Sequence, residues 1–298
     1  MQIKDSINFN SSLASFVELT KLKVVLLLVF TAIVGMLLAS DSYLQLRVLL
    51  YGSLGIGLTA ASGAVINHIF DVRIDSKMSR TSNRPLPTGK ISEKKALIFA
   101  FFLGSIGLTT LILFINLLTA ALTFLSLIGY AVVYTIYLKR STSQNIVIGG
   151  AAGATPPVLG WAAVNNEVSL FSLILFLIIF IWTPPHFWSL AIARKDDYEK
   201  ANIPMLPVTH GIDVTKIYII IYTILLFIIT LLPYILNMAG DLYLAGSILL
   251  GLGFMFYVVK LKYNNGLAME VFIYSINYLI ALFCFLLADH YILLIAPY

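Results

Sequence analysis

The sequence is poor in charged residues. Only 11% of its 298 residues are Asp, Glu, Lys or Arg, and 60% are hydrophobic, whereas a soluble domain is roughly one quarter charged. The mean hydropathy is +0.95. These values exclude an ordinary soluble domain and predict an all-α integral membrane protein, because apolar stretches cross a bilayer as helices. The net charge of +5 does not indicate nucleic-acid binding, since Lys and Arg gather in particular loops of membrane proteins.

Cysteine and the usual catalytic patterns are also scarce. The single cysteine, Cys284, excludes an internal disulfide, and its apolar neighbours favour a packing role. We find no nucleophile–base pattern and no Cys/His metal cage in the sequence. The TGK at 88–90 is not a Walker phosphate loop, because Arg84 stands where that motif needs its first glycine.

Long uncharged stretches predict nine transmembrane helices in one domain, residues 1–298. A helix needs about 20 apolar residues to cross the bilayer core. The stretch 96–138 is long enough for two helices with a turn near Asn116. The others are 24–40, 48–70, 141–166, 168–193, 217–240, 242–259 and 271–288.

The distribution of basic residues predicts the orientation. With the N-terminus cytoplasmic and the C-terminus external, 18 of the 19 Lys and Arg residues face the cytoplasm, and only Arg47 is outside. Two cytoplasmic loops are long, 66–95 and 190–216. Each has acidic residues before a Pro-rich end, PLPTG in the first and MLPVTHG in the second. We interpret them as a weak parallel internal repeat. In membrane proteins with such repeats, the binding site often lies at the interface between them.

The first long loop carries the strongest chemical signal. Asn67, Asp71 and Asp75 are spaced i, i+4 and i+8, which places them on one face of a helix. Oxygen ligands on one face suit a hard cation such as Mg²⁺, and nearby basic residues suit phosphate. The candidate phosphate contacts here are Arg73, Lys77, Arg80 and Arg84.

The second long loop adds another acidic cluster with basic neighbours. Asp196 and Asp197 both qualify as a further Mg²⁺ ligand, and the sequence does not separate them. Lys200 is a further candidate phosphate contact. Four carboxylates and a diphosphate can share a pocket only if cations lie between them. The alternative is that these are ordinary solvated loop charges, but acidic residues add nothing to topology.

Two further segments carry candidate binding residues. Lys139 and Arg140 end a predicted helix on the same side, where they suit either a diphosphate contact or a stop-transfer anchor. His186 lies in TPPHFW, where Pro184 and Pro185 are expected to interrupt the helix. The surrounding aromatic residues suit a flat ligand, and the alternative for His186 is a structural hydrogen bond.

These segments resemble the UbiA superfamily of intramembrane prenyltransferases over roughly residues 20–290. The similarity lies in NHIFDVRID, MSRTSNRPLPTG, YLKRSTSQNIVIGGAAGATPPVLGW and TPPHFWSLAIARKDDYEKANIPMLPVTHG. The RTxxRPL and PHFW…DY…PMLPV patterns resemble the branch that farnesylates haem B. The second motif of the wider superfamily has two acids four residues apart. Here Ala193 precedes Asp197 by four, so Asp197 is the matching acid.

The resemblance implies that farnesyl diphosphate, haem B and water give haem O and diphosphate. It implies that Asn67, Asp71, Asp75 and Asp197 hold Mg²⁺, that Arg80 and Arg84 contact phosphate, and that His186 neighbours haem. It also implies a cell inner membrane location, an active site facing the cytoplasm, and haem A synthase or a terminal oxidase assembly as candidate partners beside membrane lipids. Three alternatives stay open: a quinone or chlorin prenyltransferase, a secondary transporter, and a non-catalytic lipid-binding scaffold.

Overall fold

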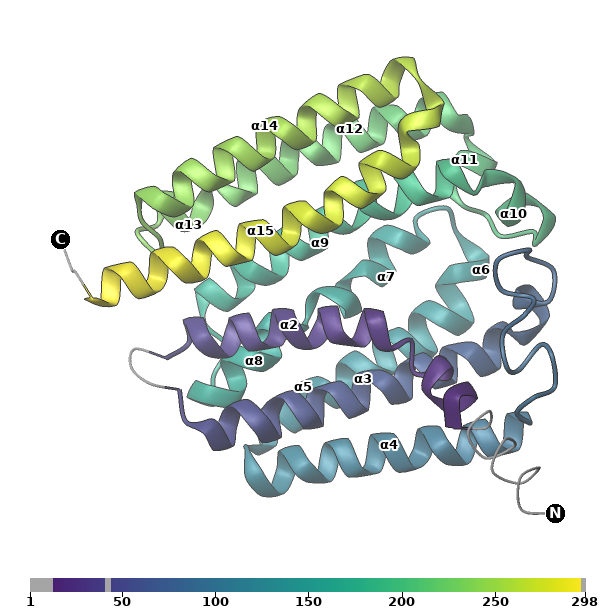
Figure 1. Cartoon of the computed structure of the whole chain (residues 1–298), viewed down its shortest axis with the longest axis horizontal. Coiled ribbons are helices and arrows are strands. Elements are labelled where there is room, and N and C mark those ends of the chain that lie inside the picture. The colour runs from purple at the N-terminus through teal and green to yellow at the C-terminus, as the bar shows by residue number, and fades with distance from the viewer. Residues whose placement is uncertain (1–12, 41–43, 296–298) are drawn as a thin grey trace.

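The computed structural model describes residues 13–40 and 44–295. Every regular element in these two ranges is a helix, and the helices lie side by side in a bundle (Figure 1). The predicted all-α fold class is confirmed for this part of the chain. The long hydrophobic helices also make the chain a multi-pass membrane protein.

The element bounds follow the hydrophobic stretches of the sequence. The helices are α2 (Leu22–Leu38), α3 (Leu46–Asp75), α4 (Glu93–Phe114), α5 (Leu117–Ile128), α6 (Lys139–Ser141), α7 (Asn145–Ala154), α8 (Pro156–Asn165), α9 (Leu170–Ala193), α10 (Lys195–Lys200), α11 (Leu206–Thr209), α12 (Gly211–Thr230), α13 (Leu232–Ile235), α14 (Asp241–Tyr263) and α15 (Ala268–Ile295). A π-helix, η1 (Gly129–Leu138), joins α5 to α6, and a 3-10 turn, η2 (Asn265–Leu267), precedes α15.

The number of spans agrees with the sequence. Eight helical segments of the described chain are long and apolar enough to cross a membrane. Counting the bent pair Leu13–Leu19 and α2, whose two parts meet at 52°, as one span gives nine. The predicted turn near Asn116 separates α4 from α5, and the Asn116 side chain accepts a hydrogen bond from the backbone N–H of Thr119 at 2.8 Å. This N-cap satisfies one of the free donors that begin a helix.

The predicted interruption of the sixth span by two prolines is wrong. α9 runs unbroken from Leu170 to Ala193 with Pro184 and Pro185 inside it. Proline removes a backbone donor, but its fixed φ is compatible with a helix, and packing against neighbouring helices holds transmembrane helices together at prolines. Near the prolines, the Thr183 hydroxyl donates a hydrogen bond to the Ile179 carbonyl, and the Ser189 hydroxyl donates one to the Pro185 carbonyl.

Small residues set the close packing of α2 on α8, two neighbouring helices of the bundle. A Cβ added at Gly35 would clash with the Pro157 carbonyl, and one added at Gly160 would clash with the Ala32 carbonyl. Glycine therefore lets the two backbones touch, as is common between membrane helices.

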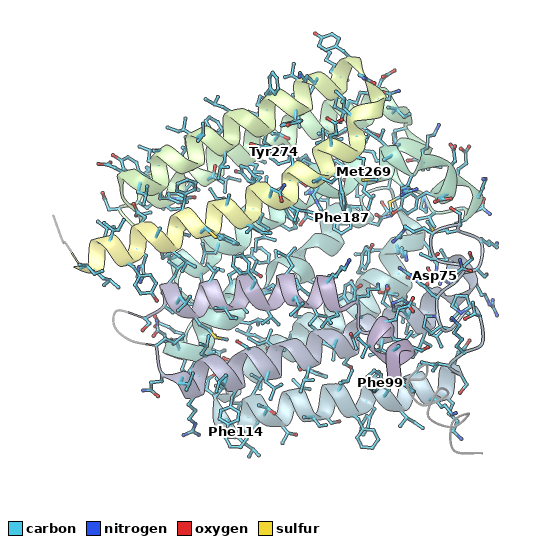
Figure 2. The ribbon with its side chains drawn as sticks, in the orientation of Figure 1. Asp75, Phe99, Phe114, Phe187, Met269 and Tyr274 are labelled. Carbon is cyan, nitrogen blue, oxygen red and sulfur yellow. The ribbon has the colours of Figure 1, made fainter. Side chains whose placement is uncertain are left out.

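Both long loops lie at one end of the bundle. The segment between α3 and α4, together with α6, α10 and α11, forms the right-hand end in Figure 1, whereas α13 and the end of α15 lie at the left. Large hydrophobic side chains are exposed along the sides between the two ends, as on a surface that faces lipid. Figure 2 shows Asp75 at the loop-bearing end and Phe114 at the opposite end.

Candidate functional site

The site is built on the last three turns of α3. Asn67, Asp71 and Asp75 are all buried, with 3%, 2% and 3% of their surface exposed. The predicted common face is confirmed, because α3 is continuous through all three positions, and each side chain also meets a partner. Three buried polar side chains in a row need such partners, since an isolated buried carboxylate is costly.

Asp71 is paired with a cation from the fourth span. Lys139 Nζ lies 2.5 Å from Asp71 Oδ2, and both side chains are largely buried. Lys139 directly follows the π-helix η1, whose wider turns change where the end of this span points. The other oxygen, Asp71 Oδ1, is buried with no hydrogen-bond partner, so the carboxylate keeps one oxygen for a ligand.

Asp75 is held by the loop that follows α3. Arg84 Nη1 donates to Asp75 Oδ2 at 2.7 Å. The Thr81 hydroxyl donates to the Asp75 carbonyl at 3.0 Å, which folds the loop back over the helix end. Arg84 lies within the RTxxRPL segment singled out in the sequence. The structure brings its guanidinium to the row formed by Asn67, Asp71 and Asp75, which is called the acid row below.

Asn67 is held from two sides. Its Oδ1 accepts from Lys21 Nζ at 2.5 Å, and its Nδ2 donates to the Thr135 hydroxyl at 3.0 Å. Lys21 lies at the bend between Leu13–Leu19 and α2, with a positive φ of 51°. Sequence reasoning counted Lys21 only toward topology and did not single out Thr135. No local pattern points to either, because their partner lies 46 and 68 residues away.

His68 is the next buried polar side chain. Its Nδ1 lies 3.8 Å from Asp75 Oδ2, and both ring nitrogens are buried without a hydrogen-bond partner.

The second loop meets the first through Asp197. The Ser79 hydroxyl donates to Asp197 Oδ1 at 3.0 Å, whereas Asp196 is exposed and has no such contact among the described residues. The structure thus favours Asp197 of the two adjacent acids. Burial raises the pKa of the neighbouring Tyr198 phenol, so that side chain stays neutral and able to donate.

The remaining predicted basic residues lie at the rim. Arg140 is exposed and donates to the Phe70 carbonyl at 2.7 Å, so it braces the end of α3 against the fourth span. Four other candidates are exposed and donate no side-chain hydrogen bond within the described ranges: Arg73, Lys77, Arg80 and Lys200.

His186 lies apart from the acid row, on α9. It is 7% exposed, and its Nδ1 is 2.7 Å from the hydroxyl of Ser275 on α15. The imidazole stacks on Trp182 at 4.2 Å and on Phe272 at 4.4 Å between ring centroids, and Phe187 meets it edge-on. The predicted aromatic surroundings are present, although an unbroken helix rather than a broken turn provides them.

The side-chain oxygens of Asn67, Asp71 and Asp75 are of the kind that bind a hard cation such as Mg²⁺. Among the described residues, no group of three or more His, Cys, Asp and Glu is arranged to hold a metal ion. The buried side-chain oxygens of this site belong to Asn67, Asp71 and Asp75. Of these atoms, Asp71 Oδ1 is buried without a hydrogen-bond partner. An unpartnered carboxylate oxygen in a set of oxygen donors fits a hard cation.

Comparison with known proteins gives consistent matches. Residues 28–288 match the model of the UbiA prenyltransferase family. Protoheme IX farnesyltransferase of Methylococcus capsulatus is 55% identical over 282 residues, which cover 94% of this chain and 95% of that protein. A protein of the same name from Legionella pneumophila (strain Lens) is 55% identical over 278 residues, covering 93% and 95%.

Solved structures agree on the fold. A structure described for digeranylgeranylglyceryl phosphate synthase superposes with a TM-score of 0.78 at 22% identity, covering 94% of this chain and 99% of that one. A UbiA homologue from Archaeoglobus fulgidus bound to DMAPP and Mg²⁺ superposes with a TM-score of 0.64 at 16% identity, covering 91% and 99%. The resemblance noted in the sequence is confirmed, and the chain belongs to the UbiA prenyltransferase family.

Proposed function

We propose that the chain transfers the farnesyl group of farnesyl diphosphate to a vinyl group of haem B, with uptake of water, giving haem O and diphosphate. The observation that carries this proposal is the buried row of Asn67, Asp71 and Asp75, paired with cations at one end of a membrane bundle. The acceptor is supported by relatives of 55% identity over nearly the whole chain that are named protoheme IX farnesyltransferase.

The donor head group binds at the acid row. Asn67, Asp71, Asp75 and Asp197 would hold Mg²⁺, which is supported by the partnerless oxygen of Asp71 and by the Mg²⁺ in the Archaeoglobus fulgidus homologue. Bound Mg²⁺ would act as a Lewis acid that stabilises negative charge on the departing diphosphate.

The cations of the site serve the phosphates. Arg84 and Lys139 each pair with one carboxylate, and Lys21 binds an amide oxygen. These three cations would also contact the diphosphate, and the Arg84 guanidinium offers a two-point grip. Five further basic residues are exposed around the site, where they attract the anionic substrate. They are Arg73, Lys77, Arg80, Arg140 and Lys200.

The acceptor explains why no protein nucleophile is needed. The bond between farnesyl C1 and oxygen breaks, and its electron pair leaves with the diphosphate. The vinyl π-electrons of haem form the new C–C bond, which leaves a cation on the carbon next to the macrocycle. Water adds there and loses a proton, giving the hydroxyl group. His186, among Trp182, Phe187 and Phe272, is the candidate haem neighbour.

The site faces the cytoplasm in the cell inner membrane. This is supported by the placement of 18 of 19 basic residues on the side of the two long loops. Haem A synthase or a terminal oxidase assembly would then receive the product within the same membrane.

The test is to incubate purified protein with haem B, Mg²⁺ and isotopically labelled farnesyl diphosphate, and to analyse the pigment by mass spectrometry. We expect haem that has gained one labelled farnesyl group and one water, and no such product when a chelator replaces Mg²⁺. The Glu167→Ala variant, altered at a solvent-exposed acid in the turn between α8 and α9, should match wild type. Transfer of label to an added quinone but not to haem would refute the proposed acceptor.

A further inference from the structure

Ser275 links α15 to α9 through two separate contacts, one to His186 and one to Trp182. Its hydroxyl lies 2.7 Å from His186 Nδ1, and its backbone carbonyl accepts from Trp182 Nε1 at 2.8 Å. Ser275 is fully buried and His186 is nearly so. Since Trp182 binds the backbone, the hydroxyl of Ser275 is not needed for that contact between α9 and α15.

The hydrogen bonds of the Ser275 hydroxyl decide which imidazole nitrogen carries the proton. A serine hydroxyl has one hydrogen to donate, and this one points to the Phe272 carbonyl at 2.6 Å. When that hydrogen bond is made, the hydroxyl can only accept from His186, and Nδ1 is then the donor. A neutral imidazole with hydrogen on Nδ1 has a free lone pair on Nε2.

Nε2 is left available in this arrangement. It makes no hydrogen bond within the described chain, and it is not among the polar atoms enclosed without a partner. The ring cannot turn freely, because Trp182 and Phe272 stack on its two faces at interplanar angles of 18° and 23°. A histidine that binds metal usually donates its other N–H to an acceptor in this way.

We propose that Ser275 is a positioning residue that holds His186 with hydrogen on Nδ1, so that Nε2 binds the iron of the haem substrate. Trp182 and Phe272 fix the plane of the imidazole and thereby the orientation of the macrocycle. This inference rests on the proposed function, because it takes haem B as the acceptor. It adds the residue that sets the tautomer and the atom that meets the iron.

The experiment compares Ser275→Val with Ser275→Thr, which have nearly the same shape and differ in the hydroxyl. Purified proteins are titrated with haem B without farnesyl diphosphate, and affinity is read from the Soret band. The iron–imidazole stretching band of the reduced complex is then recorded by resonance Raman spectroscopy. His186→Ala is the reference without the proposed ligand. If Ser275→Val does not stay folded, Ser275→Ala is compared in its place.

We expect Ser275→Thr to match wild type. Ser275→Val should bind haem roughly 10-fold more weakly and shift the iron–imidazole band, because Nδ1–H has lost its acceptor. His186→Ala should lose the band, and added imidazole should restore one. Equal affinity and an equal band in Ser275→Val and Ser275→Thr would overturn the role of Ser275, and a band that persists in His186→Ala would overturn the ligand.

Farnesyl transfer by wild type, measured in parallel, separates this inference from the function. Formation of farnesylated haem together with identical spectra in all variants would leave the function standing and reject the inference. Absence of any farnesylated haem, with a normal iron–imidazole band in wild type, would reject the function.

Discussion

Replacing Asp71 by alanine removes a carboxylate that has two roles. One oxygen neutralises Lys139 at 2.5 Å, and the other is buried without a partner and is assigned to Mg²⁺. The two losses should appear in different measurements. Loss of the ion pair should lower the free energy of unfolding. Loss of the metal ligand should lower the rate of farnesyl transfer.

The size of each effect follows from burial. The Lys139 side chain is 14% exposed and that of Asp71 is 2% exposed, so the variant leaves a buried ammonium unpaired. Removing one partner of a buried pair typically costs about 3–5 kcal/mol. Removing a residue that hydrogen-bonds a metal ligand typically lowers activity about 10- to 100-fold. Loss of the ligand itself should lower farnesyl transfer by at least ~100-fold.

The double variant Asp71→Ala with Lys139→Met separates the roles. Methionine at position 139 carries no charge and needs no ionic partner. The free energy of unfolding in detergent should therefore return most of the way to the wild-type value. Farnesyl transfer should remain low at every Mg²⁺ concentration. Wild-type activity in Asp71→Ala, or recovered activity in the double variant, would refute the assignment of Asp71 to the metal.

Two further predictions concern the same end of the bundle, and a third concerns the orientation of the chain in the membrane. Arg84→Lys keeps the charge but loses the guanidinium fork, so the KM for farnesyl diphosphate should rise about 10-fold while haem titrations stay unchanged; weaker haem binding instead would place Arg84 at the haem propionates. Asp197→Asn should raise the Mg²⁺ concentration needed for half-maximal rate, whereas Asp196→Asn should not, and equal behaviour would reject the choice between the two acids. Reporter fusions should place Lys200 in the cytoplasm and Asn166 outside, and the reverse result would invert the topology.

The acid row could be predicted from the sequence because its information is local. Spacing alone places Asn67, Asp71 and Asp75 on one helix face, and the structure confirms the burial of that face. Their partners could not be predicted in this way. Lys21 lies at a bend between two apolar runs and meets Asn67 only after the bundle has formed. The family resemblance indicated Asp197 rather than Asp196, and the contact with Ser79 supports that choice.

The fold was predictable where hydrophobicity and charge decide it. The helix count and the turn at Asn116 follow from apolar length and a capping side chain. The expected break at Pro184 and Pro185 was wrong, because local backbone preference does not include packing against neighbouring helices. Nor does spacing reveal that a π-helix precedes Lys139. The weak repeat between loops 66–95 and 190–216 stays a prediction.

The distance along the chain between Asp71 and Lys139 has a consequence for biosynthesis. Their contact spans 68 residues, so α3, α4 and α5 must all be made before the carboxylate meets its ammonium. A lone ionised side chain is expensive inside the bilayer. Until the fourth span has been made, Asp71 lacks this partner, so the ion pair forms late in biosynthesis.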